Sequence, residues 1–291
     1  MSTPSHHINE QHASAAFTKQ SVKFDGIYAN DIIIQYKRER VRNHIQQLLL
    51  PNSNILELNS GTGEDAVWLA QEGHTVHATD ISRGMQEQLQ QKVKSLHLQQ
   101  QISNELISFT QLENLQEQKK YDHIFSNFAG LNCTGELDKV LQSFSRLLNP
   151  GGKITLVILP KFCLWEFLLL FKGQFKTAFR RLFSSRGVTA HVEGEYFTCW
   201  YYNPSFVKKQ LQNEFELLGL EGLCSLVPPS YLERFAAKHP GLYNYLKAKE
   251  NKWKFKWPWK FIGDYYIISF KKKEILFGSH EGLNFFGEKL G

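Results

Sequence analysis

Apolar positions between residues 55 and 80 follow two different spacings, and the change between them predicts three successive elements. Ile55 to Leu58 is a short apolar run with one acid, which suits a buried strand and is too short for a helix. Apolar residues return at helical spacing over 66–70, and Gly73 ends that helix. Residues 75–79 read as a second strand, which ends in Asp80. The stretch is therefore predicted to be a strand–turn–helix–strand unit.

Helical and strand-like spacing continue to alternate downstream, which predicts a parallel sheet with helices on both faces. A helix is expected to begin at its N-cap Asp31 and to stop at Pro51, and Asn149-Pro150-Gly151-Gly152 separates a later helix from a strand. The later helices are expected at 84–98 and 137–148, and the strands at 106–110, 121–127, 153–159, 216–227 and 264–270.

The turn at Asn59–Gly63 is the first candidate for a binding site. Gly61 and Gly63 adopt backbone conformations closed to other residues and let a ligand approach the main chain. The acids Glu64 and Asp65 follow, where they suit the positive end of a starting helix. With Asp80 at the tip of the next strand, this arrangement predicts a nucleoside-binding site.

Two ligand classes use such a turn. A dinucleotide fold requires G-x-G-x-x-G followed by an acid about 20 positions on, for the ribose hydroxyls. Gly61 and Gly63 supply the first pair, but Ala66 and Val67 stand where the third glycine is expected. Asp80 is compatible with either class, and a tight turn without a ligand is the simplest explanation of the glycine pair.

The run from Glu57 to Gly63, Glu-Leu-Asn-Ser-Gly-Thr-Gly, resembles the first motif of class I S-adenosylmethionine-dependent methyltransferases. The chain departs from that motif at Asn59, where the family has a glycine, but asparagine tolerates the left-handed backbone better than most residues. The loop 149–152 resembles the one before the fifth strand of these enzymes. The resemblance covers roughly residues 30–160 and is closest to small-molecule enzymes of the ubiquinone/menaquinone methylase type.

This resemblance implies an α/β fold: a Rossmann-like, seven-stranded, mostly parallel sheet with helices on both faces and an antiparallel last strand. It implies S-adenosyl-L-methionine as cofactor, and no metal. It also places an adenine-binding turn after the third strand, and a helix over the cleft from which Tyr28 or Arg38 touches the ligand or merely packs on the surface. The cofactor residues it implies are Glu57, Asn59, Ser60, Gly61, Gly63, Asp80, Ile81, Gln111, Leu112 and Asn127.

Composition indicates a globular chain with one substantial core. Of its 291 residues, 42% are hydrophobic and 21% charged, and 22 Phe, 11 Tyr and 6 Trp suggest an aromatic-lined pocket. Four cysteines without paired spacing argue against a zinc site and fit a cytoplasmic location. We expect a disordered tail at 1–20, a methyltransferase domain at 21–274 with lid insertions at 161–202 and 228–262, and a C-terminal tail at 275–291.

Both insertions carry cations among apolar residues. Residues 162–186 are predicted to form a basic amphipathic helix, which either contacts an anionic membrane surface peripherally or packs as a lid on its own domain. Residues 247–260 alternate lysines with aromatic residues, a pattern that suits RNA, lipid headgroups or, as we favour, a strand with one wet face. Nucleic acid is disfavoured as a substrate because 126–129 lacks the Asn/Asp-Pro-Pro-Tyr motif of base methylases.

Three polar residues in the first insertion are candidates for proton transfer. His191, Glu193 and Glu195 stand at alternate positions, so a continuous strand puts all three on one face. His191 is then the candidate base, although a polar surface strand explains the same pattern. Tyr201 and Tyr202 are further pocket candidates, whereas His123, in mid-strand, is expected to be a satisfied interior histidine.

The sequence thus predicts methyl transfer to oxygen or carbon of a small lipophilic or aromatic molecule. Positioning the acceptor in line with the methyl group is the main requirement of that chemistry. Two alternatives remain: a nicotinamide-dinucleotide-dependent oxidoreductase, and a methyltransferase-like module that binds without turnover.

Overall fold

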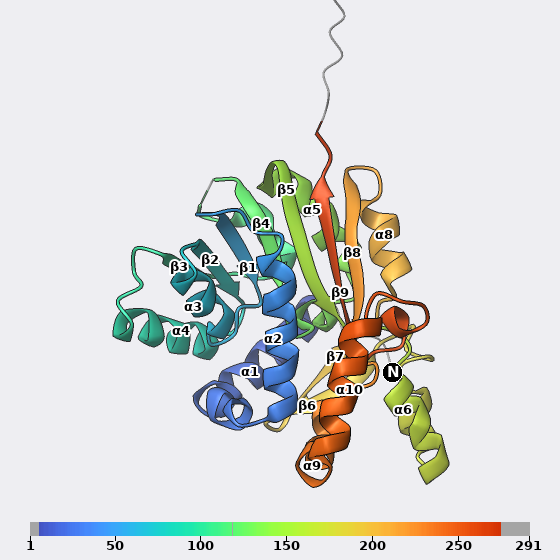
Figure 1. The fold of residues 1–291 in the computed structure, drawn as a ribbon. Helices are drawn as coiled ribbons and strands as arrows, with labels where there is room; N and C mark the ends of the chain where they lie inside the picture. Colours follow the sequence, from blue (N-terminus) through green and yellow to red (C-terminus); the bar gives the residue numbers. More distant parts are fainter. Residues whose placement is uncertain (1–5, 118, 275–291) are drawn as a thin grey trace, which may run out of the picture.

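The computed structural model describes residues 6–117 and 119–274, whose strands form a seven-stranded sheet and a separate hairpin (Figure 1). The large sheet has the order β3-β2-β1-β4-β5-β9-β8, and β9 runs antiparallel to the direction that its other strands share. Its strands are β1 (Asn54–Leu58), β2 (Thr75–Asp80), β3 (Ile102–Leu106), β4 (Tyr121–Ser126), β5 (Leu148–Ile158), β8 (Phe215–Leu223) and β9 (Tyr265–Lys272). The predicted seven-stranded, mostly parallel sheet with an antiparallel last strand is confirmed.

Helices cover both faces of this sheet because alternate strand residues point to opposite sides. Ile55 and Phe125 pack in one cluster with α2 (Ile32–Gln46), α3 (Glu64–Gln71) and α4 (Arg83–Ser95). Their neighbours Leu56 and Ile124 pack in the other with η1 (Phe109–Asn114), α5 (Leu137–Leu147) and α8 (Pro204–Leu211). The buried central strands are therefore apolar on both faces, as parallel strands require.

The start of α2 follows the predicted capping chemistry. Asp31 has an extended backbone, and its side chain accepts hydrogen bonds from the amides of Ile33 and Ile34 at 2.8 and 2.9 Å. These bonds satisfy two of the amides that a helix leaves free at its N-terminus. The N-cap prediction is confirmed.

Two sequence predictions near the pocket are wrong. The third strand lies at Ile102–Leu106 rather than 106–110, which belong to the connection and to η1. Residues 6–20 are not a disordered tail but form most of α1 (His6–Ala29), in which Ala13 and Ala16 are buried. Residues 1–5 and the expected tail at 275–291 lie outside the described residues.

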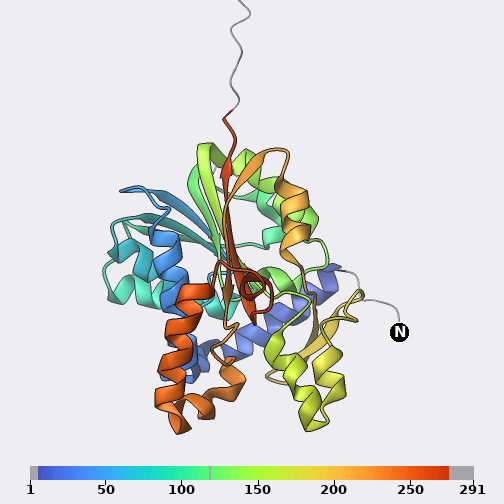
Figure 2. The ribbon, with the colours of Figure 1, turned by 45° about the vertical axis from the view of Figure 1, so that its right-hand side comes forward.

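The two insertions project from the lower end of the sheet, where α1 also lies (Figures 1 and 2). The first contains α6 (Leu164–Leu168), η3 (Leu169–Lys172), α7 (Phe175–Phe179) and the hairpin β6 (Val188–Val192) and β7 (Glu195–Cys199). The second contains η4 (Ser230–Leu232), α9 (Glu233–Lys238), α10 (Pro240–Trp253) and η5 (Trp259–Phe261). Short helices thus replace the single amphipathic helix predicted at 162–186, and the favoured strand at 247–260 is wrong because α10 and η5 occupy most of it.

Candidate functional site

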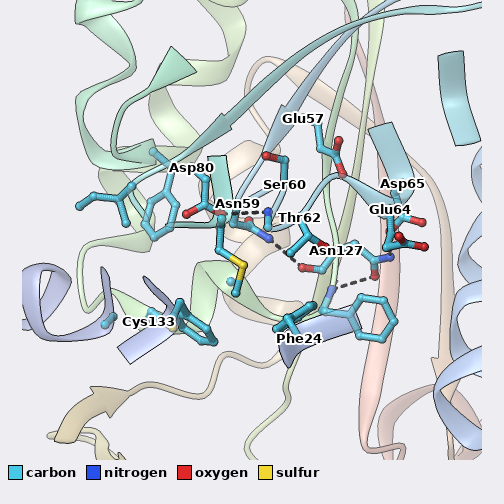
Figure 3. Close-up of a pocket in the computed structure, with 18 of the residues that line it drawn as sticks. Phe24, Glu57, Asn59, Ser60, Thr62, Glu64, Asp65, Asp80, Asn127 and Cys133 are labelled. Carbon is cyan, nitrogen blue, oxygen red and sulfur yellow. Dashed lines mark hydrogen bonds between the residues drawn. The ribbon is translucent and has the colours of Figure 1, made fainter. Parts of the chain in front are cut away.

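A cavity lies between the carboxyl ends of β1, β2 and β4 and the helix α1 (Figure 3). Ligands of open α/β sheets collect at this edge. The lining residues come from the helices α1, α2, α3 and α4, from the three strand ends and the turns after them, from the start of η1, and from the loop and short helix η2 (Gly130–Cys133) after β4. They are Glu10, Ala13, Phe17, Phe24, Arg38, Glu57, Asn59, Ser60, Gly61, Thr62, Glu64, Asp65, Asp80, Ile81, Met85, Ser108, Phe109, Asn127, Phe128, Gly130 and Cys133.

The turn after β1 adopts the left-handed backbone that its sequence predicts. Asn59, Gly61 and Gly63 have φ angles of 47°, 56° and 81°. A Cβ on Gly61 would meet no atom within 4 Å, whereas one on Gly63 would lie 2.1 Å from Leu89 Cδ1. Gly61 therefore leaves the main chain open toward the cavity, and Gly63 packs against α4 instead of lining the cavity.

Asn59 also explains why the turn tolerates the loss of a glycine. Its side-chain amide donates to the carbonyl of Asn127 at 2.8 Å, and its side-chain oxygen accepts from the hydroxyl of Ser126 at 2.6 Å. Both partners lie at the end of β4, so the side chain ties the ends of two adjacent strands together. Because Gly130 has no Cβ, it leaves room for this side chain; a Cβ there would lie 2.2 Å from Asn59 Cγ.

Asp80 closes the opposite side of the turn. One carboxylate oxygen accepts from the amide of Gly61 at 2.9 Å, and the other accepts from the amide of Ser82 at 2.8 Å. Burial raises the pKa of Asp80, and these amide hydrogen bonds oppose that rise. An oxygen of a carboxylate has a second lone pair, so Asp80 retains acceptor capacity toward the cavity.

Glu57 places a buried carboxylate oxygen without a hydrogen-bond partner at the wall of the cavity. Its side chain is 2% exposed, and Oε2 has no hydrogen-bond partner. Burial first, and then the neighbouring charge of Asp65, raise the pKa of Glu57 well above its usual range, against the opposing charges of Arg38 and Arg42. A buried acceptor without a partner is costly, and such groups concentrate at functional sites.

Asp65, at the start of α3, accepts hydrogen bonds from α2 and from the loop after β4. Asn127 donates to one of its oxygens at 2.7 Å, and Arg38 and Arg42 both donate to the other at 3.3 and 3.0 Å. Arg38 also lies over the Phe128 ring, 5.2 Å from its centroid. Arg38 therefore lines the cavity, whereas Tyr28 is not among the lining residues.

Helix α1 covers the cavity on the side away from the sheet and is held there by polar contacts. Ser14 donates to the carbonyl of Ile81 at 2.9 Å, and Thr62 donates to Asp25 at 2.6 Å. Glu10 accepts from the hydroxyls of Ser108 and Thr110 at 2.8 and 3.1 Å. The cavity measures about 140 Å³, whereas small-molecule sites measure roughly 300–1,000 Å³. Binding of a whole nucleoside there therefore requires α1, or side chains next to it, to move.

The predicted turn after β3 is displaced by a few residues from its actual lining positions. Gln111 is exposed in η1, and Leu112 is 1% exposed in the core; neither lines the cavity. Ser108 and Phe109 take that place. This correction follows from the earlier position of β3, which moves the whole connection toward the N-terminus.

The three candidates for proton transfer do not share a strand face. Glu193 has a φ of 47° in the β6–β7 turn, so the strand is interrupted between His191 and Glu195. His191 stacks on Tyr196 with ring centroids 4.4 Å apart, and Glu195 pairs with Lys19 at 2.5 Å. None of the three lines the cavity.

The other predicted side chains have structural partners. His123 is 1% exposed and its Nε2 lies 2.9 Å from the Thr155 hydroxyl, which confirms it as an interior histidine. Tyr202 donates to the carbonyl of Thr134 at 2.6 Å, and Tyr201 lies beneath Arg181, whose guanidinium is 5.1 Å from the ring centroid. Neither tyrosine lines the cavity.

Sequence reasoning missed the contribution of α1, which supplies Glu10, Ala13, Phe17 and Phe24. The available signal was the aromatic pair Phe17 and Phe24, two helical turns apart. The remaining buried positions of α1 are small or polar, so they give no apolar stripe.

Part of the chain matches a known protein family. Residues 55–152 match the family model described as a methyltransferase domain. The S-adenosyl-L-methionine-dependent Diels-Alderase iccD of Talaromyces variabilis is 34% identical over 112 residues, and the chain spans only 38% of that relative's length, with 38% of this chain covered.

Solved structures resemble the chain over most of its length. The [4+2]-cyclase SpnF has a TM-score of 0.59 at 14% identity, with 91% of this chain and 96% of that chain covered. The 1,6-didemethyltoxoflavin-N1-methyltransferase of Burkholderia thailandensis, solved with its substrate and S-adenosylhomocysteine, has a TM-score of 0.57 at 11% identity, covering 94% and 93%.

The chain therefore has the Rossmann-like class I methyltransferase fold, and its turn after β1 lies within the matched methyltransferase domain. The predicted family resemblance is confirmed. A nicotinamide-dependent oxidoreductase loses support, because the turn after β1 and the elements around it, residues 55–152, match a methyltransferase domain.

Proposed function

We propose that this methyltransferase-fold chain binds S-adenosyl-L-methionine in the cavity beneath α1 and transfers its methyl group to oxygen or carbon of a small lipophilic or aromatic molecule. The observation that carries this proposal is Glu57 Oε2, a buried acceptor without a partner at the cavity wall. It fits a cationic amino group, which the cofactor has at its methionyl end.

The other lining residues fit the remaining parts of the same cofactor. Asp80 offers carboxylate oxygens for the ribose hydroxyls, and the open backbone at Gly61 admits the chain between sugar and sulfur. Apolar side chains for the adenine are Ile81, Met85 and Phe109. The cofactor supplies an electrophilic methyl group on a sulfonium, and the enzyme has to hold an acceptor in line with it.

Two observations support a lipophilic acceptor. Phe17, Phe24 and Phe128 line the cavity around the polar groups, so an apolar molecule gains contact area there. Two structural neighbours bind small molecules, one 1,6-didemethyltoxoflavin and the other geranyl diphosphate. The proposal assigns no general base to His191, Glu193 or Glu195, since all three lie outside the cavity lining.

A turnover experiment tests this function. The purified chain is incubated with methyl-labelled S-adenosylmethionine and a panel of phenols, enols and prenyl compounds, and S-adenosylhomocysteine is measured together with the product masses. We expect stoichiometric S-adenosylhomocysteine and a product one methylene heavier than its acceptor. Cofactor binding without turnover across an organic extract of the source cells would instead identify a binding module.

A pericyclic reaction is the second candidate. The match to a Diels-Alderase favours it, as does a cavity lining that contains no histidine among the described residues. Cycloaddition needs a shaped, apolar site and no proton transfer. In that case a polyene substrate gives an isomer of unchanged mass, and bound S-adenosylmethionine is not consumed.

A further inference from the structure

Three aromatic side chains stand exposed on the arm that follows β5, which we define as residues 164–186. The exposed fractions of Phe171, Phe183 and Phe175 are 85%, 82% and 62%. Single exposed apolar residues are ordinary, but several on one projecting element indicate an interaction surface. A lid packed on its own domain would bury these rings.

The charged side chains that this arm exposes are all positive. Its single acid, Glu166, is 1% exposed and is bound by Arg180 and Arg181. Lys172, Lys176 and Arg186 are exposed, and within the described residues none of them forms a salt bridge. The outer surface of the arm therefore combines aromatic rings with unpaired cations.

The base of the arm is fixed to the sheet. Arg181 is 4% exposed and donates to Asp264 Oδ1 at 2.7 Å and to the carbonyl of the same residue at 2.9 Å. Asp264 directly precedes β9. Because this contact fixes the arm in place, the exposed rings are presented outward by a firmly attached element.

The arm and α9 project from the same end of the sheet, the end that α1 covers (Figures 1 and 2). This is the carboxyl end of the parallel strands, where the cavity opens beneath α1. No helix among the described residues is long and apolar enough to cross a bilayer. Contact with a membrane would therefore be made from its surface.

We propose that the arm docks this protein on an anionic lipid surface, with Phe171, Phe175 and Phe183 inserted among the acyl chains and Lys172, Lys176 and Arg186 against the headgroups. Charge complementarity selects this occupant, since the arm offers exposed cations and no exposed acid. Docking here places the cavity end of the molecule toward the bilayer. The inference is separate from methyl transfer and holds for either reaction proposed above.

Sedimentation with vesicles tests this inference. The full chain is mixed with vesicles of phosphatidylcholine and phosphatidylserine, or of phosphatidylcholine alone. We expect binding to the mixed vesicles that weakens with added salt and is much weaker on phosphatidylcholine. The variant Phe171→Ser/Phe175→Ser/Phe183→Ser should lose about a hundredfold in partitioning, and Lys172→Glu/Lys176→Glu at least about tenfold.

Phe255→Ser/Trp257→Ser is the matched control, because these side chains are 53% and 79% exposed in the other basic-aromatic segment. It should bind like the wild type, and circular dichroism should show all variants folded. The inference is overturned if the wild type ignores both vesicles, or if the control variant loses binding while the arm variants keep it. Self-association that disappears in the triple variant, without lipid binding, would identify a second copy of the chain as the occupant and would equally refute it.

Discussion

Carboxylates are buried both in the cofactor cavity and in the seam, by which we mean the contact of Glu166 and Arg181 in the arm with Lys37 and Asp264. Only in the seam does every buried carboxylate pair with a cation. In the cavity, Glu57 has an oxygen without a partner, and Asp80 is held by backbone amides alone. In the seam, Asp264 pairs with Lys37 at 2.9 Å and with Arg181 at 2.7 Å. Among the described residues, Glu57 and Asp80 therefore have no cation bonded to them, whereas Asp264 has two.

The pKa values follow this difference. Burial raises the pKa of Glu57 and of Asp80. Burial acts in the same direction on Asp264, but the charges of Lys37 and Arg181 outweigh it and lower the pKa of that carboxyl below its usual range. The fold thus pairs Asp264 with two of its own cations, whereas Glu57 and Asp80 in the cavity keep carboxylate oxygens that a ligand can bind.

The seam also explains a cluster that resembles a metal site. Ligand atoms of Cys163, Glu166 and Asp264 lie within 4.8 Å of one another, and all three residues are buried. Lys37 and Arg181 already neutralise the two carboxylates there, so the chain itself provides the positive charge. A metal ion would have to displace these side chains.

Removal of a seam cation should have the largest effect. Lys37→Met leaves Asp264 with one cation fewer in a buried site, and such losses cost about 3–5 kcal/mol of unfolding free energy. Lys19→Met is the control: Lys19 is 54% exposed and pairs with Glu195 at the surface, where a salt bridge contributes less than about 1 kcal/mol. Urea denaturation measures both, and equal losses would contradict the proposed role of the seam.

Low pH should weaken a second buried interaction, that of Glu221 with Arg40 and His44 of α2. Burial acts to raise the pKa of Glu221, but its hydrogen bond with His44 and the charge of Arg40 lower it to about 2. Because the pKa is lower in the folded state, the stabilisation is complete above the unfolded pKa of about 4.3 and is lost as the pH falls toward 2.

The Glu221 pair should therefore contribute about 3 kcal/mol at neutral pH. Urea denaturation of wild type and Glu221→Gln should show a large stability difference at pH 7 that closes as the pH approaches 2. A difference that stays constant with pH would show that the substitution acts through packing rather than through charge.

Substitution of Glu57 in the cavity should not lower the unfolding free energy, unlike substitution of Lys37 or Glu221. Glu57→Gln removes a buried charge that has no cation of its own, so the unfolding free energy should stay the same or rise by about 1 kcal/mol. Affinity for S-adenosylmethionine should fall about tenfold, because a charged hydrogen bond is lost. Glu113→Gln, at a 51% exposed side chain that pairs with Arg146 outside the cavity lining, is the control and should leave both unchanged. A clear destabilisation by Glu57→Gln would place Glu57 among the compensated acids.

The contrast between the two regions also explains how much the sequence reveals. The unit from β1 to β2 was predictable because its apolar spacing, its glycines and Asp80 are local signals. The α1 cover was not, since its buried residues include Asn9 and Glu10, whose partners Cys133, Thr198 and Ser108 lie far away in the chain. Polar residues that are buried by distant partners leave no apolar pattern.

Two further errors have similar causes. The edge strand β3 has only two buried positions, so the apolar pair formed by its last residue, Leu106, and the following Ile107 gave the stronger signal. The lysine–aromatic alternation at 247–260 matches a strand, but its lysines lie over rings within a helix, as Lys249 does over Tyr245 and Trp253. In that segment, contacts between side chains four residues apart favour a helix over a strand.

The most direct test of the central claim is calorimetric titration of S-adenosylhomocysteine into the wild type, Asp80→Ala and Asp80→Asn. The structure predicts that the wild type binds one ligand per chain and that the alanine variant loses about a hundredfold or more in affinity. The asparagine variant, which keeps an oxygen for the Gly61 amide, should lose less. A folded wild type that fails to bind, or an alanine variant with unchanged affinity, would contradict the assignment of this cavity.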